Sequence, residues 1–162
     1  IKKMAEKAGF QYYAKVPWKK GTFVSNTGRK AKNTEDVLLF TKGKARCLRP
    51  DKQRNLDADG NPTRFMSGAA GMLPTCFDVQ AVSKKNVIAQ SEKPVELYKQ
   101  ILEYITQQGE IVLDQFAGSG AVGQAAMETG RKAILVEFDK SKVKNIAKRL
   151  NMIKMGGLCV SL

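Results

Sequence analysis

The chain has 162 residues, 43% of them hydrophobic, which suits one compact domain with a hydrophobic core. Lysine and arginine number 28 against 15 acidic residues, and the resulting net charge of +13 favours a polyanionic partner. Histidine is absent and the cysteines, Cys47, Cys76 and Cys159, are isolated, which argues against metal sites, disulfides and histidine-activated nucleophiles.

The chain opens Ile1-Lys2-Lys3-Met4, without the apolar stretch of a signal peptide. No apolar run reaches the roughly 18 residues of a membrane span, so we expect a cytoplasmic protein with no membrane partner. Residues 4–9 have the composition of the last turns of a helix, with Gly9 in the position that follows its C-cap. Aromatic and β-branched residues then predict a strand over residues 10–18.

Positive charge is concentrated in the first third of the chain. Residues 1–54 hold 15 basic and 4 acidic side chains, a net of +11, whereas residues 55–162 hold 13 and 11, a net of +2. A polar, basic loop is predicted over residues 22–33, and we expect Arg29, Lys30 and Lys32 to contact DNA phosphates. The alternative is a solubilising surface charge with no nucleic-acid partner.

The middle of the chain is predicted to be mostly irregular. Residues 37–40 form a second short strand, and residues 46–85 are rich in turn and linker compositions. This long excursion is either a contact region for a macromolecular substrate or a plain surface loop.

Helices and short strands alternate in the remainder. Apolar residues at helical spacing predict a helix from Pro94, in its first turn, to Gln108, and small residues predict another over residues 121–129. Asp139 is predicted to cap a last helix. Its apolar stripe is Val143, Ile146, Ala147, Leu150 and Ile153. With a final strand over residues 158–162, the pattern indicates an α/β fold with helices on both faces of the sheet.

A glycine-rich loop lies between a strand ending at Asp114 and the helix from Ala121. Gly118 and Gly120 allow a tight turn and a close approach of the backbone to a ligand. The next apolar strand ends at Glu137, whose carboxylate can accept hydrogen bonds from ribose hydroxyls. Strand, glycines, helix, strand and acid in this order predict a site for an adenosyl ligand, the alternative being a turn that binds nothing.

The order of segments resembles the DNA methyltransferases that methylate amino groups (cytosine N4 or adenine N6), in the permuted class whose catalytic half precedes the S-adenosylmethionine half. The resemblance runs from Met72 to Leu150 and rests on residues 73–77, 91–97, 114–120 and 131–137. It implies a Rossmann-like, S-adenosylmethionine-dependent methyltransferase fold that is incomplete at the N-terminus. It also implies S-adenosyl-L-methionine as cofactor, DNA as substrate, and a place in restriction-modification or in a phage.

The chain departs from the family pattern at three places. Gln115 stands where the family usually has proline, and Ala89-Gln90 where it commonly has His-Pro. The catalytic tetrapeptide, an Asp, Asn or Ser followed by Pro-Pro and an aromatic residue, occurs nowhere in the chain. We therefore expect a C-terminal fragment that is inactive alone, the alternative being a relic that binds cofactor without methyl transfer.

The resemblance assigns roles to individual residues. The cofactor-binding set it implies is Ser91, Lys93, Asp114, Phe116, Ala117, Gly118, Ser119, Gly120, Glu137 and Phe138. Phe116 and the loop backbone would hold the methionine end, Glu137 the ribose and Phe138 the adenine ring, with Ser91 and Lys93 near the carboxylate.

Within one structural domain, the expected regions are a basic remainder of the catalytic half (residues 1–45), an irregular DNA-contacting region (46–88) and a cofactor-binding half (89–162). Two other functions stay open: a basic module that binds nucleic acid without catalysis, and a nicotinamide-dependent oxidoreductase, because Gly118, Gly120 and Gly123 also fit the dinucleotide fingerprint.

Overall fold

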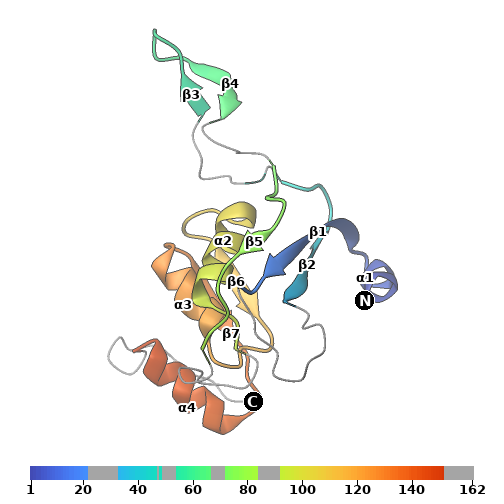
Figure 1. The fold of residues 1–162 in the computed structure, drawn as a ribbon, viewed down its shortest axis with the longest axis vertical. Coiled ribbons are helices and arrows are strands. Elements are labelled where there is room, and N and C mark those ends of the chain that lie inside the picture. The colour runs from blue at the N-terminus through green and yellow to red at the C-terminus, as the bar shows by residue number, and fades with distance from the viewer. Residues whose placement is uncertain (22–32, 47, 49–53, 67–71, 84–91, 152–162) are drawn as a thin grey trace. The chain divides into compact units, whose positions relative to one another are not determined.

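A computed structural model of the chain describes residues 1–21, 33–46, 48, 54–66, 72–83 and 92–151. The chain divides into two compact units, Ile1–Gln80 and Ala81–Leu162 (Figure 1). Alternating helices and parallel strands in the second unit confirm the predicted α/β class. No helix in the described part of the chain is long and apolar enough to cross a membrane.

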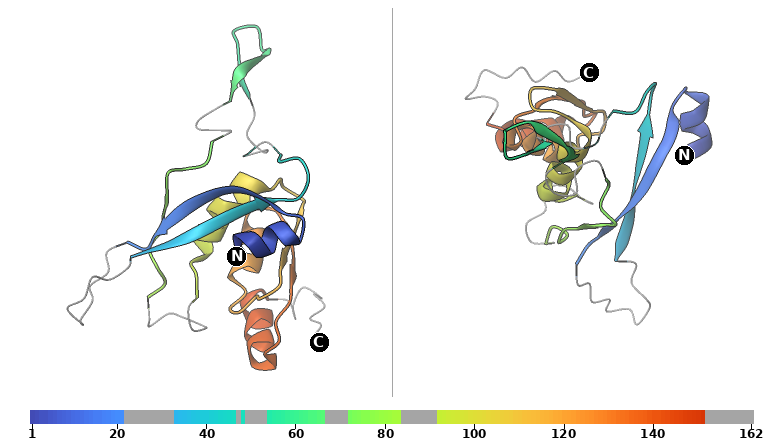
Figure 2. Two further views of the ribbon diagram at one scale, coloured as in Figure 1. Left: turned by 90° about the vertical axis from the view of Figure 1, so that its right-hand side faces the viewer. Right: turned by 90° about the horizontal axis from the view of Figure 1, so that it is seen from above.

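The first unit begins with a helix and a mostly antiparallel sheet. Its elements are α1 (Lys2–Lys7), β1 (Gln11–Lys19), β2 (Thr34–Thr41) and β5 (Phe77–Asp78). The sheet order is β2-β1-β5, with β1 antiparallel to β2 and parallel to β5. The long β1–β2 pair is visible in both views of Figure 2. Gly9, at φ +82°, ends α1 as predicted.

The core of this sheet comes from alternate residues of β1. Val16 and Trp18 are buried, as a period of two requires for one face of a strand. Trp18 pairs with Phe77, and its indole N–H donates to the Val79 carbonyl at 2.8 Å. The strand predicted over residues 37–40 extends to Thr34–Thr41 because β1 offers pairing partners along that whole length.

The prediction that residues 46–85 are irregular is wrong in part. A hairpin of β3 (Arg54–Leu56) and β4 (Pro62–Met66) lies within this stretch. Asp57 closes its turn, because its Oδ1 accepts the N–H groups of Asp59 at 3.0 Å and Asn61 at 2.8 Å. Gly60 adopts φ +82° in the same turn. Turn residues that looked like a linker thus form a hydrogen-bonded hairpin connection.

The described residues of the second unit form two parallel strands and three helices. They are α2 (Val95–Ile105), β6 (Ile111–Asp114), α3 (Ala121–Glu128), β7 (Lys132–Leu135) and α4 (Lys140–Arg149). Strands β6 and β7 pair from Ile111↔Lys132 to Asp114↔Leu135. Asp139 caps α4 as predicted, because its carboxylate accepts the N–H of Ser141 at 2.9 Å.

Side chains on one face of β6–β7 pack against the helices. Val112 and Ala133 contact a cluster of Leu102, Ala125 and Ala126. Leu135 packs against a second cluster formed by Ala117, Ile146 and Leu150. On the opposite face, the large hydrophobic residues Ile111, Leu113 and Ile134 are each more than half exposed. Helical cover is therefore seen on one face within the described residues, where the sequence predicts it on both.

Helix α2 is shorter than predicted. It begins at Val95, with Pro94 as N-cap, and ends at Ile105, because Thr106 is extended. Arg131 binds the hydroxyl of Thr106 at 3.1 Å and its carbonyl at 2.8 Å, a tertiary contact that competes with further helix. The final stripe is buried at Ile146, Ala147 and Leu150. Ile153 and the strand predicted over residues 158–162 lie outside the described residues.

Candidate functional site

The glycine loop turns the chain sharply between β6 and α3. Gly118 has φ +53° and Gly120 has φ +77°, in the left-handed region that favours glycine. Gly120 is the N-cap of α3, and its N–H donates to the Ala117 carbonyl at 2.7 Å. A Cβ added at Gly120 would lie 3.1 Å from the Ile146 side chain, so packing also limits the size of this residue.

Two acids lie at the same edge of the sheet. Strands β6 and β7 are parallel and in register, so Asp114 and the segment after Leu135 both lie at the carboxyl ends of the strands. The Asp114 carboxylate accepts the N–H of Phe116 at 3.1 Å. Glu137 accepts the N–H of Gly118 at 2.7 Å on one oxygen and that of Asp139 at 2.9 Å on the other. The carboxylate of Glu137 therefore ties the glycine loop to the neighbouring strand.

The hydrogen bond from the Asp139 N–H is the main reason that the pKa of Glu137 is lowered. Partial burial acts in the opposite direction and the Gly118 N–H adds to the lowering. Glu137 is therefore ionised at neutral pH, and each carboxylate oxygen keeps acceptor capacity beyond the backbone bond that it accepts. A ligand with hydroxyl groups is a suitable partner for such a carboxylate.

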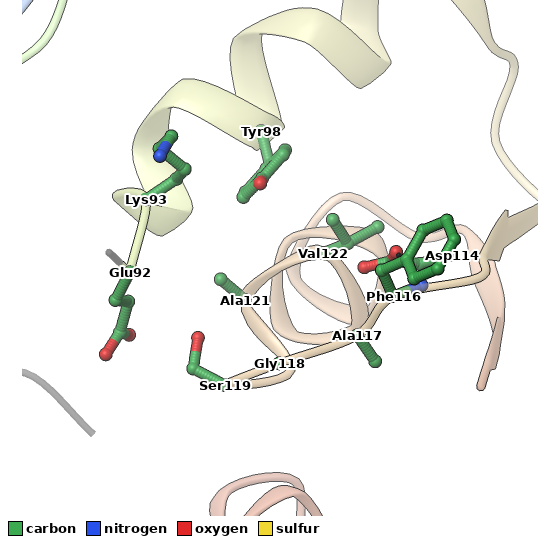
Figure 3. A pocket seen from close by; sticks show the side chains of 10 residues that line it. All are labelled: Glu92, Lys93, Tyr98, Asp114, Phe116, Ala117, Gly118, Ser119, Ala121 and Val122. Atoms are coloured by element: carbon green, nitrogen blue, oxygen red, sulfur yellow. Dashed lines mark hydrogen bonds between the residues drawn. The ribbon is translucent and has the colours of Figure 1, made fainter. Parts of the chain in front are cut away.

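A pocket of about 270 Å³ lies on one side of the loop, and we name it the Lys93 pocket (Figure 3). Its wall away from the loop is formed by Glu92, Lys93 and Tyr98, at the start of α2. The predicted site residues that line it are Lys93, Asp114, Phe116, Ala117, Gly118 and Ser119. The pocket therefore offers a lysine, a carboxylate and loop backbone to one ligand.

A second pocket, of about 360 Å³, is lined by Glu137 and Phe138, and we name it the Phe138 pocket. Phe116 and Gly118 line both pockets, so the two adjoin at the glycine loop. The exposed fractions of Phe116 and Phe138 are 88% and 93%. Single exposed aromatic residues are ordinary on protein surfaces. Two that line one pocket, however, provide ring faces on which a planar ligand can stack.

The structure thus brings together most of the residues that the sequence singles out. Gly120 lines neither pocket but caps α3, and Ser91 lies outside the described residues. Tyr98 and Lys142 line the pockets but were not predicted. Tyr98 follows Pro94 by one helical turn and Lys142 lies in the first turn of α4, so helical spacing from the two caps could have indicated both.

The basic loop with Arg29, Lys30 and Lys32 lies outside the described residues. Lysines in and beside β1 form ion pairs with acids of the same unit. The pairs are Lys15–Asp36, Lys19–Asp78 and Lys20–Glu35. Among the described residues, no group of three or more Cys, Asp or Glu side chains is placed to hold a metal ion.

Comparison with known proteins adds independent information. A family model described as "DNA methylase" matches residues 1–149. The Type II methyltransferase M2.DpnII of Streptococcus pneumoniae is 28% identical over 158 residues, which cover 90% of this chain and 53% of that protein. The DNA adenine methyltransferase YhdJ of Escherichia coli is 39% identical over 62 residues, covering 38% of this chain and 21% of that protein.

Solved structures agree with the sequence relatives. The M1.HpyAVI-SAM complex superposes with a TM-score of 0.70 at 25% identity, covering 93% of this chain and 68% of that one. The cytosine-N4-specific PvuII DNA methyltransferase has a TM-score of 0.62 at 16% identity, covering 95% and 61%. The chain spans about half of the length of the relatives M2.DpnII and M.HpaI, which it matches along most of its own length.

Proposed function

The chain belongs to the DNA methylase family, whose model it matches over residues 1–149, and on this basis we propose that it is the cofactor-binding part of an amino-methylating DNA methyltransferase. The reaction is transfer of a methyl group from S-adenosylmethionine to the exocyclic amino group of cytosine (N4) or adenine (N6) in DNA. The observation that carries the proposal is the pair of adjoining pockets on either side of the glycine loop. The name of the Type II relative supports a place in restriction-modification.

The two pockets match the two ends of the cofactor. Glu137 and Phe138 line one pocket, where a carboxylate for ribose hydroxyls and a ring for adenine stacking occur together. Lys93 lines the other, where its ammonium group suits the methionine carboxylate. Asp114 lines the same pocket and suits the methionine ammonium group. S-adenosylmethionine supplies an electrophilic methyl group when bound, and these residues would orient it toward the base.

Calorimetry with S-adenosylhomocysteine and with NAD tests this proposal and separates it from the two alternatives. We expect S-adenosylhomocysteine to bind and NAD not to bind. Binding of NAD alone would identify an oxidoreductase that uses the same glycine pattern. Binding of neither ligand by folded protein would leave a basic nucleic-acid-binding module with an inert glycine turn.

We also propose that this chain by itself transfers no methyl group. The Pro-Pro-aromatic tetrapeptide that accepts the amino proton and stacks the flipped base in the family is absent from the 162 residues. Positioning and proton acceptance each contribute several orders of magnitude in rate, so turnover should remain at background. The measurement is incorporation of tritiated methyl groups into unmethylated DNA, with M2.DpnII as the positive control. Turnover above background would place a proton acceptor within residues 1–162.

A further inference from the structure

A part-buried ion pair joins the end of the last described helix to the segment before α2. Nη1 of Arg149, the last residue of α4, lies 2.6 Å from Oε1 of Glu92. The exposed fractions of the two side chains are 14% and 3%. Removing two charges from water is costly unless good geometry and further hydrogen bonds compensate. A pair with so little exposure of its side chains therefore depends on the arrangement of the segments that carry it.

Arg149 also binds two elements around the glycine loop. Its Nε donates to the side-chain carbonyl of Gln124 in α3 at 2.6 Å, and its Nη1 donates to the backbone carbonyl of Ser119 at 3.2 Å. A guanidinium group presents several donors in a rigid plane, so one side chain can hold three acceptors at once. Arg149 is therefore bonded to the segment before α2, to the loop and to α3.

These three elements form the Lys93 pocket. Glu92 and Ser119 are themselves lining residues, on the two sides of the pocket (Figure 3). In that view the Glu92 side chain extends away from Tyr98. A bond from Arg149 to each side therefore controls how far the segment of Lys93 lies from the loop, although Arg149 is not a lining residue.

We propose that Arg149 is a positioning residue that holds the Lys93 pocket in its ligand-binding geometry through Glu92 and Ser119. The inference rests on the proposed function in that the ligand of this pocket is the methionine end of S-adenosylmethionine or its product. Without the guanidinium group, Glu92 loses its ion pair with Arg149 and the segment before α2 moves away from the loop. Affinity falls in proportion to the fraction of molecules that keep the competent geometry.

The competing explanation is that Arg149 only stabilises the fold, and Arg131 provides the matched control. Arg131 is a buried arginine of the same unit, 5% exposed. It binds the Thr106 hydroxyl and carbonyl and the Thr129 carbonyl. It precedes β7, at the opposite strand end from Glu137. Arg131→Gln should therefore lower the melting temperature without changing ligand affinity.

The test is calorimetric titration of S-adenosylhomocysteine into the wild-type chain and its variants, beside thermal melts. If Arg149→Gln keeps the competent geometry about a tenth of the time, its Kd rises about tenfold. The Kd of Arg149→Lys should lie between those of wild type and Arg149→Gln, because lysine keeps the positive charge but lacks the planar guanidinium group. Glu92→Gln/Arg149→Gln should bind no more weakly than the weaker single variant, because both residues act as one unit. An unchanged Kd in folded Arg149→Gln, or an equal loss in Arg131→Gln, would overturn the proposal.

Hydrogen exchange of the unliganded protein supplies a readout that needs no cofactor. Peptides covering residues 92–98 and 117–122 should exchange faster in Arg149→Gln and in Glu92→Gln than in wild type. Their exchange rates in Arg131→Gln should equal those of wild type. Equal exchange in wild type and both pocket variants would overturn the positioning role. If wild type fails to bind S-adenosylhomocysteine, the proposed function is wrong, and the exchange rates still decide whether Arg149 orders the pocket. If Arg149→Gln does not fold, Glu92→Gln carries both measurements.

Discussion

At the scale of single residues, Glu137 is notable in the candidate site because hydrogen bonds fix both oxygens of its carboxylate. Both of its carboxylate oxygens accept backbone N–H groups, one from the glycine loop and one from the turn into α4. These bonds favour the ionised form, which lowers the pKa of Glu137. The side chain is therefore held in one orientation before any ligand arrives, and preorganisation of this kind reduces the entropic cost of binding.

Glu137→Ala should weaken binding of S-adenosylhomocysteine by roughly 1–3 kcal/mol, through loss of charge-assisted hydrogen bonds to the ribose. Calorimetry on the folded variant measures the change. Glu103→Ala is the matched control, because Glu103 is an exposed carboxylate of α2 that lines neither pocket. Equal affinity of wild type and Glu137→Ala would remove Glu137 from the cofactor site.

At the scale of elements, the connection from β6 to α3 depends on backbone conformations that only glycine adopts readily. Gly120 has φ +77°, and a Cβ there would meet Ile146 of α4 at 3.1 Å. Gly109, between α2 and β6, has φ +82° but no atom within 4 Å of an added Cβ. The two glycines therefore share the same backbone requirement and differ in packing.

Alanine at either position should lower the free energy of unfolding by roughly 1–2 kcal/mol, the cost of a left-handed conformation for a residue with a Cβ. The free energy of unfolding should fall further in Gly120→Ala than in Gly109→Ala, because Ile146 must also shift. Urea unfolding of the two variants measures the difference. Equal losses of unfolding free energy would show that α4 accommodates the methyl group without an energetic cost. Backbone strain alone would then explain the glycine at position 120.

At the scale of the whole molecule, positive charge is distributed unevenly along the sequence, because residues 1–54 alone carry a net charge of +11. Three lysines in and beside β1 are already in ion pairs with acids of the same unit. Exposed pairs of this kind contribute little to stability, but they reduce the local positive field. We therefore assign the DNA contact to the basic loop, and propose that Arg29, Lys30 and Lys32 bind phosphates.

Replacing Arg29, Lys30 and Lys32 by glutamine should make DNA binding less dependent on salt. The slope of log K against log salt concentration should become shallower by about 0.9 for each phosphate that the variant no longer neutralises. The reduction in affinity should be similar for all DNA sequences, since phosphate contacts carry no base information. The control replaces exposed lysines four residues apart on α4, with the same change in charge. These are Lys140, Lys144 and Lys148. An equal effect of both triple variants would mean that total charge, and not the loop, determines binding.

Much of the second unit could be predicted from the sequence because its signals are local. The cap at Asp139, the glycines at positions 118 and 120 and the helical periodicity of α2 each depend on neighbours within a few residues. The resemblance to a known family added the roles of Glu137 and Phe138, and the structure places both in one pocket. Their roles in cofactor binding stay predictions.

The sequence alone thus determined the α/β class, the glycine loop and most helix and strand positions in the described part of the chain, because short-range backbone preferences set them. Only the tertiary structure revealed that Trp18 pairs with Phe77, and that Arg149 binds Glu92. These partners lie more than fifty residues apart, and no local propensity encodes which distant segments meet. Chain packing brings such groups together, and it also decided where α2 ends and where the unexpected β3–β4 hairpin forms.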